Sequence, residues 1–142
     1  MANFVKTLAY KNNNPFNIKY NSSNHWLGLV SNNRGFCKFE SLSYGVRAGF
    51  VLLKSYIDRG FNTPSKIIIR FAPSTENNFA QYLAYCCETS NLYLDQEIDN
   101  SFNLLKFGCA MMFIECSYTP SPNMISYIID LVKNWSYEKE NS

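Results

Sequence analysis

The sequence predicts one α+β domain over residues 1–142, mostly helical and with a small β-rich lobe near its N-terminus. The lobe is indicated by residues 12–40, which combine many asparagines with a proline and two glycines and lack helical periodicity. The helical part is indicated by apolar residues that recur at helical spacing between capping signals from residue 43 onward. A chain of this length can bury a sufficient apolar core without metals or disulfides.

Within residues 12–40, the segment 31–35 has the composition of a hairpin turn and leads into an expected strand at 36–39. We expect the helical lobe to cover residues 43–136. The charged residues 137–142 are expected to form a tail outside the packed helices.

Five helices are expected in the helical lobe, and capping residues mark the first three. Ser43 can cap a helix that ends at Gly60, where glycine accepts a left-handed backbone. Thr63 followed by Pro64 supplies an N-cap and a proline at the first helical position. Ser74 or Thr75 can cap the third helix.

The last two helices differ in how their apolar residues are arranged. Residues 101–115 carry apolar side chains on more than one face, which indicates a largely buried helix. Ser121 and Pro122 open the final helix, whose apolar residues between Ile125 and Trp135 keep helical spacing and predict one buried face.

Charge is distributed unevenly along the chain. Residues 1–71 hold ten basic and two acidic side chains, whereas residues 72–142 hold three basic and nine acidic ones. A basic half favours polyanions such as cell-envelope polymers, nucleic acid or acidic lipid head groups, although the two halves can also balance each other within one fold. Because the basic residues form no stripe interleaved with aromatic residues on one helix, we expect no nucleic-acid partner.

The cysteine and histidine pattern excludes a zinc site. The five cysteines include no C-x-x-C pair, and His25 is the one histidine. We expect free, mostly buried thiols in a reducing compartment. The chain has no glycine-rich phosphate loop, so we expect neither metal nor cofactor. It also has no apolar signal core and no run of 18 apolar residues, so we expect cytosolic synthesis without a signal peptide and no membrane insertion.

Glu115 is the main candidate for a catalytic residue. It stands near the C-terminal end of an otherwise apolar helix, where low hydration and the partial negative charge of the helix end both disfavour the ionised carboxylate. A carboxyl group that keeps its proton suits a general acid that cleaves a glycosidic bond. The alternative is an exposed glutamate paired with a lysine.

Four other polar residues are candidates for the same cleft. Glu40 follows the expected hairpin and could supply a second carboxylate, although an acid near a helix N-terminus is favoured in any case. Glu76 and Asn77 stand in the first turn of the third expected helix, where the same alternative holds for Glu76. Arg70 ends a run of isoleucines and could contact substrate or a carboxylate, or remain a solvated cation.

Aromatic residues make up 16% of the chain against 17% charged residues, an excess that favours a use beyond core filling. In the N-terminal half they occur singly among polar turns, a pattern typical of a groove that binds a long polar ligand such as a glycan strand. Trp26, Tyr20 and Tyr44 could form walls on which sugars stack, or could belong to the core and its rim.

Taken together, six short motifs resemble a family of lysozyme-like, peptidoglycan-degrading proteins of bacteriophage virions and prophages. The motifs are N-N-P-x-N-I at 13–18, W-x-G at 26–28, F-x-x-F-[DE] at 36–40, G-[IV]-R-A at 45–48, R-[WY]-A-P at 70–73, where Phe71 takes the aromatic position, and E-N at 76–77. The resemblance covers about residues 12–82 and resumes at 112–115. Residues 13–28 are also similar to a segment of bacterial cell-wall glucosaminidases, in which the catalytic glutamate precedes this segment.

The resemblance implies a lysozyme-like fold and cleavage of the peptidoglycan glycan backbone, with Glu115 as general acid and Glu40 or a held water completing the reaction. It implies that Asn13, Asn17, Trp26, Tyr44 and Arg47 shape the cleft, with Arg70, Glu76 and Asn77 as further substrate contacts. Where relatives commonly have Thr or Asn followed by Gly, this chain has Cys116-Ser117, which predicts a strained left-handed turn beside Glu115.

We therefore expect a muramidase or glucosaminidase of phage or prophage origin that acts at the bacterial cell wall, either as a virion component or delivered by another route. Its partners would be peptidoglycan strands and other virion or secretion proteins. The alternative is a non-catalytic module of the virion or cell envelope that keeps the fold and binds glycan. The sequence leaves open which glycosidic bond is cut, and whether water or an internal hydroxyl completes the reaction.

Overall fold

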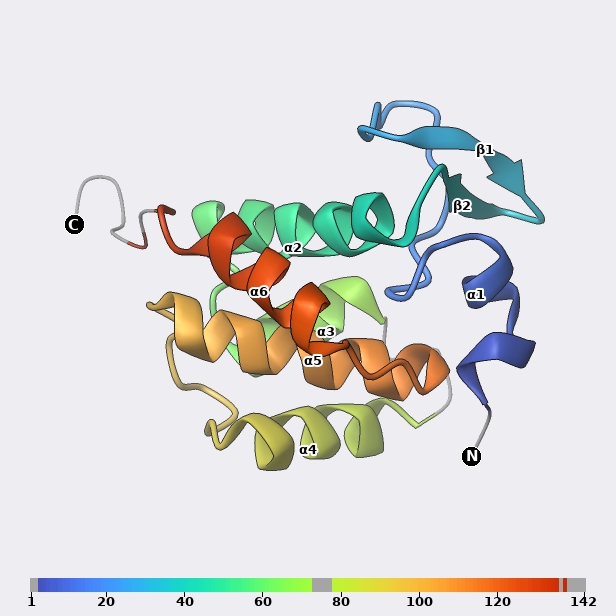
Figure 1. Cartoon of the computed structure of the whole chain (residues 1–142). Coiled ribbons are helices and arrows are strands. Elements are labelled where there is room, and N and C mark those ends of the chain that lie inside the picture. The colour runs from blue at the N-terminus through green and yellow to red at the C-terminus, as the bar shows by residue number, and fades with distance from the viewer. Residues whose placement is uncertain (1–2, 73–77, 136, 138–142) are drawn as a thin grey trace.

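The computed structural model describes residues 3–72, 78–135 and 137, and it confirms a mostly helical α+β chain with one small sheet (Figure 1). Before the β-rich lobe it has a 3-10 helix η1 (Phe4–Lys6) and a short helix α1 (Leu8–Lys11), which the sequence pattern did not reveal. Both are only one turn long, too short for periodicity to show. No helix in the described part of the chain is long and apolar enough to cross a bilayer.

The sheet is a two-stranded antiparallel hairpin of β1 (Leu29–Asn33) and β2 (Phe36–Phe39). Its turn is Arg34 and Gly35, both with positive φ, as a two-residue hairpin turn requires. The predicted hairpin is confirmed, but the turn is shorter than expected because residues 31–33 pair as strand. A single bridge from Lys19 to Phe36 attaches the preceding segment to the hairpin.

The turn at Asn13–Asn17 is held to the hairpin by the buried side chain of Asn14. Its amide nitrogen donates to the carbonyl oxygens of Ile18 (3.1 Å) and Cys37 (2.9 Å), and its oxygen accepts from the Ile18 amide (3.0 Å). The side chain is fully buried, so these bonds satisfy backbone groups that water cannot reach.

Helices α2 (Leu42–Asp58), α3 (Pro64–Phe71) and α4 (Phe79–Ser90) follow. Thr63 caps α3 as predicted and accepts from the Lys66 amide. The cap predicted for α2 was wrong by two residues: Ser41 is the N-cap, and Ser43 lies in the first turn, with its hydroxyl 3.0 Å from that of Ser41. The predicted caps at residues 74 and 75 lie outside the described residues.

Helix α5 (Ser101–Cys116) is the centre of the helical part and contacts α2, α4 and α6 (Pro122–Val132) (Figure 1). This explains why its apolar residues spread around the helix, as predicted. Helix α6 lies across α2 and α5 and buries Ile128 and Val132, while Ile129 is 45% exposed. Within the apolar stripe predicted on α6, Ile128 and Val132 are therefore buried, whereas Ile129 faces solvent.

Three glycines allow close approach between these elements. A Cβ at Gly45 would lie 1.8 Å from the Asn13 carbonyl oxygen, and one at Gly49 would meet the Phe16 ring at 1.9 Å. Both are in α2, so the glycines explain how the turn at 13–17 can lie directly against this helix. Gly108 of α5 likewise allows the Phe50 ring of α2 to pack directly against the α5 backbone.

Replacing Asn14 by Ala should lower the free energy of unfolding by about 3 kcal/mol or more, since three buried hydrogen bonds to the backbone of Ile18 and Cys37 are lost. Urea unfolding measures the change. Asn32→Ala is the matched control: that exposed side chain accepts one bond from the Gly35 amide, and its loss should cost less than about 1 kcal/mol. Equal costs for the two variants would contradict the role given to Asn14.

Candidate functional site

A pocket of about 570 Å³ lies where the segment before the hairpin meets α2, α3 and the C-terminal end of α5. Its wall combines polar, aromatic and charged side chains from these separate parts of the chain. Those on which the argument depends are Asn17, Tyr20, Trp26, Tyr56, Arg70 and Glu115.

Glu115 is the second-last residue of α5 and lines this pocket. It is half-buried, and the helix that carries it buries Met111 and Met112 completely. The carboxylate is thus presented to the pocket from the end of an apolar helix, next to amide and aromatic groups of the β-rich lobe. This is an arrangement in which a carboxylic acid could deliver a proton to a bound ligand.

The end of α5 is fixed by the two residues that follow Glu115. The Cys116 thiol is buried and lies 3.3 Å from the carbonyl oxygen of Pro15, to which it can donate. Ser117 has a left-handed backbone (φ 62°), and its amide donates to Phe113 at 2.8 Å, which closes the helix. The left-handed turn predicted here is confirmed, and Cys116 attaches it to the turn at 13–17.

Five of the residues that the sequence suggested for the site meet in the pocket: Glu115, Asn17, Tyr20, Trp26 and Arg70. Asn17 has a positive φ of 55°, a conformation that asparagine tolerates better than most residues. The buried Nε1 of Trp26 has no hydrogen-bond acceptor among the described residues. The guanidinium of Arg70 lies 3.7 Å from the centroid of the Phe61 ring, and this contact holds the side chain at the edge of α3.

The structure does not bring Glu40, Asn13, Tyr44 and Arg47 into the pocket wall. Glu40 is exposed at the hairpin end, where its amide donates to Gly28. Asn13 donates its side-chain amide to the carbonyl of Phe39 at 2.9 Å, so its role is to join the turn to β2.

Tyr44 and Arg47 lie on another part of α2. Tyr44 packs so closely on Gly28 that a Cβ there would lie 2.2 Å from its ring. Burial raises the pKa of Tyr127 on α6, and the nearby Arg47 partly offsets this, which places Arg47 toward α6. The remaining two candidates, Glu76 and Asn77, lie outside the described residues.

Several pocket residues were not predicted as substrate contacts. Lys19 and Phe71 line the wall, and Leu52 and Tyr56 contribute one face of α2. The spacing of four between Leu52 and Tyr56 could have revealed that these two share a face. Spacing alone could not reveal that this face is only half-buried. The neighbouring face of α2 fills the core instead and consists of Val46, Phe50, Leu53 and Ile57.

The cysteines agree with the prediction of free thiols, and no group of three His, Cys, Asp or Glu residues in the described ranges could hold a metal. Burial raises the pKa of Cys109 to about 11. It raises that of Cys116 to about 12, an effect to which the neighbouring Glu115 carboxylate adds and which a backbone hydrogen bond to Tyr118 opposes. These thiols are therefore protonated and unreactive near neutral pH.

Comparison with known proteins gives one informative similarity. The chain is 30% identical over 95 residues to "Protein P5" of Pseudoalteromonas phage PM2, which links it to bacteriophage proteins. The match covers 63% of this chain and 59% of the phage protein, so the chain spans less than two thirds of the length of that relative. No family model matches the chain.

Replacing Ser117 by Gly should raise the free energy of unfolding by about 0.5 to 1 kcal/mol. Glycine removes the steric cost of the left-handed turn. Its larger conformational entropy in the unfolded chain offsets part of this stabilisation. Thermal or urea unfolding measures the change. Ser101→Gly, at the start of the same helix, is the control and should destabilise. A destabilised Ser117→Gly variant would show that the serine side chain makes a contact that matters.

The contribution of two buried thiols to the free energy of unfolding should be constant between pH 7.5 and about 9 and fall as the pH rises toward 11–12. The thiols of Cys109 and Cys116 have folded-state pKa values above the ordinary value of 9.0, so above that pH the unfolded chain loses protons that the folded chain keeps. Urea unfolding at pH 7.5 and 10 measures this. A Cys109→Ala, Cys116→Ala double variant should show a shallower fall, and an unchanged slope would contradict the assignment.

Proposed function

We propose that this chain is a glycosidase that cleaves the glycan backbone of peptidoglycan, with Glu115 as the general acid and a lysozyme-like architecture. The observation that carries the proposal is that Glu115, at the end of α5, shares one pocket with Asn17 and Trp26 of the β-rich lobe. These residues are about a hundred positions apart in the sequence, and the fold brings them to the same wall.

The chemistry of the pocket wall suits a sugar. Sugars present apolar ring faces beside hydroxyl groups, and the wall offers the aromatic rings of Tyr20, Trp26 and Tyr56 beside the amides of Asn17 and Asn21. The buried Nε1–H of Trp26, which lacks an acceptor among the described residues, is a donor whose partner a small rearrangement or a bound ligand would supply.

In the proposed reaction Glu115 protonates the leaving glycosidic oxygen as the bond to the anomeric carbon breaks. We propose that a water molecule oriented by amides of the β-rich lobe then bonds to the anomeric carbon and releases its proton to bulk solvent, while the Glu115 carboxylate regains a proton, because Glu40 does not line the pocket. Glu40 is then a surface carboxylate at the end of β2, and its removal would leave the reaction largely intact.

The biological setting we propose is a phage or prophage enzyme that acts on the bacterial cell wall, as a virion component or beside secretion proteins. The similarity to a phage protein supports a phage-related origin. Whether the bond at muramic acid or the one at glucosamine is cut is a question for mass spectrometry of the released fragments.

A second candidate function is a non-catalytic module that binds wall glycan. It is favoured by the left-handed Ser117 directly after the helix end, a position where glycine would be less strained. Such a module would use the same aromatic and amide wall and would not depend on a proton from Glu115.

Replacing Glu115 by Gln should lower the rate of clearing of a peptidoglycan suspension by at least about 100-fold, the contribution typical of a general acid. Glutamine keeps the shape of the side chain and removes its proton. The matched control is Glu88→Gln on the exposed side of α4, which should clear at the rate of the unmodified protein. Circular dichroism verifies that both variants fold.

The outcomes separate the two candidate functions. Equal clearing by Glu115→Gln and the unmodified protein would reject Glu115 as the acid. Glycan binding without clearing by the unmodified protein would favour the binding module. The Glu40→Gln variant should clear peptidoglycan within about twofold of the unmodified rate. A loss of clearing rate comparable to that of Glu115→Gln would show that Glu40 takes part in catalysis.

A further inference from the structure

Two arginines meet around one aromatic ring at the α2–α3 end of the pocket. The Arg70 guanidinium carbon lies 3.7 Å from the centroid of Phe61, and that of Arg59 lies 5.8 Å from the same centroid. Arg59 is also 5.4 Å from the ring centroid of Tyr56. Two cations thus share a small cluster of aromatic surface, which we call the arginine cluster: Tyr56, Arg59, Phe61 and Arg70.

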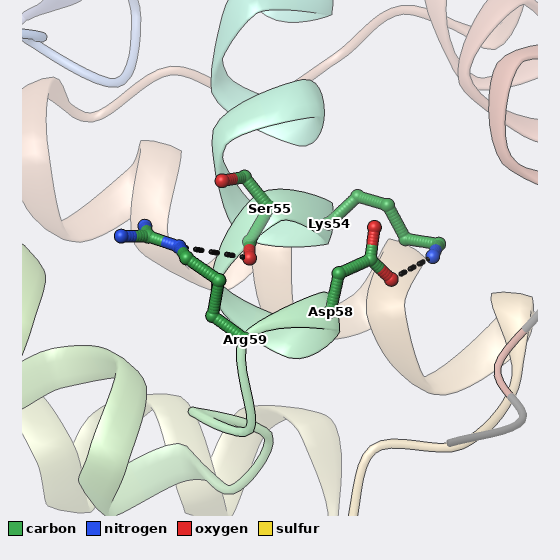
Figure 2. Close-up of polar contacts among 4 residues, drawn as sticks. All are labelled: Lys54, Ser55, Asp58 and Arg59. Atoms are coloured by element: carbon green, nitrogen blue, oxygen red, sulfur yellow. Dashed lines mark hydrogen bonds and ion pairs between the residues drawn. The ribbon is translucent and has the colours of Figure 1, made fainter. Parts of the chain in front are cut away.

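Local contacts aim Arg59 away from the nearest acid on its helix. Its Nε donates to the carbonyl oxygen of Ser55 at 3.2 Å, whereas the neighbouring Asp58 is bound by Lys54 on another side of α2 (Figure 2). Within the described residues, no ion pair joins Arg59 or Arg70 to a carboxylate. The two guanidinium groups carry like charges and repel each other, and a bound anion would relieve that cost.

The arginine cluster opens into the proposed active site. Arg70 and Tyr56 line the same pocket as Glu115. Burial raises the pKa of Tyr56, and the charges of Arg59 and Arg70 act against this rise. Tyr56 and Arg70 both contribute to the pocket wall, and a phenol hydroxyl and a guanidinium fork are donors suited to the oxygens of a carboxylate or phosphate.

We propose that the arginine cluster is a subsite for an anionic oxygen group carried by the wall glycan. The group is either a carboxylate, from the lactyl ether or its attached peptide, or the phosphate of a polymer linked to the glycan. This inference rests on the proposed function, and it adds that the enzyme prefers an acidic glycan over a neutral one. Arg70 is the direct contact, and Arg59 supports it through charge.

The test is glycan binding to the Glu115→Gln protein, which does not consume its ligand, followed by the fluorescence of Trp26 and Trp135 or by calorimetry. Three soluble peptidoglycan fragments are compared: untreated, with carboxyl groups converted to methylamides, and stripped of phosphate by hydrofluoric acid. We expect Arg70→Gln to weaken binding of the untreated fragment by about tenfold or more, the effect of one lost charge-assisted hydrogen bond. Arg34→Gln, the same change at the hairpin turn, should have no effect.

The treatment of the glycan that weakens binding in the same way as Arg70→Gln identifies the anionic group that the arginine cluster binds. If methylamidation weakens binding and abolishes the effect of the variant, the anion is a carboxylate; if phosphate removal does so, it is a phosphate. Equal binding of all three fragments, with no effect of Arg70→Gln, overturns the subsite and leaves the proposed function standing. No binding of any fragment, with no clearing by the unmodified protein, overturns both.

Discussion

The arrangement of the site depends on the buried amide of Asn14. Three hydrogen bonds from one fully buried side chain hold the turn at 13–17 against Ile18 and the hairpin. The turn in turn supplies the Pro15 carbonyl that receives the Cys116 thiol, and Gly45 and Gly49 let it lie directly on α2. The carboxylate of Glu115 therefore owes its place beside Asn17 to a polar group that never reaches the pocket itself.

Most of the secondary structure was predictable because its signals are local. Proline and threonine at the start of α3, serine and proline at the start of α6, and the Arg34-Gly35 turn each fix a boundary through backbone chemistry. The one-turn helix α1 also begins at a capping residue, Thr7, whose hydroxyl accepts from the Tyr10 amide, but it is too short for periodicity to support that signal. The displaced cap of α2 shows that two serines two positions apart, Ser41 and Ser43, cannot be distinguished as caps without the path of the preceding strand.

The candidate site was predictable only in part, because several motif residues join segments of the chain and do not line the pocket. Asn13 and Tyr44 look like ligand contacts in the sequence, yet they hold parts of the chain together: Asn13 bonds to β2, and Tyr44 covers Gly28. Gly45, from the same motif as Arg47, lets the Asn13 backbone lie directly on α2. Segments that must fit closely show the same mixture of glycine, asparagine and aromatic residues as a binding groove. The residues that line the pocket from α2 and α3 are Leu52, Tyr56, Arg70 and Phe71, and apart from Arg70 nothing in the sequence distinguishes them from ordinary helix residues beside the core.

One consequence follows from the way α5 carries Glu115. A helix rotates about 100° per residue, so adding or deleting a single residue inside α5 would swing the carboxylate out of the pocket or force the Cys116 contact to break. The connection between α4 and α5 makes no contribution to the pocket wall. That connection nevertheless buries Leu92 and Ile98 in the core and is hydrogen-bonded to Asn62 and Ser65, so a change of length should be rejected there for reasons of stability and within residues 101–116 for the position of Glu115.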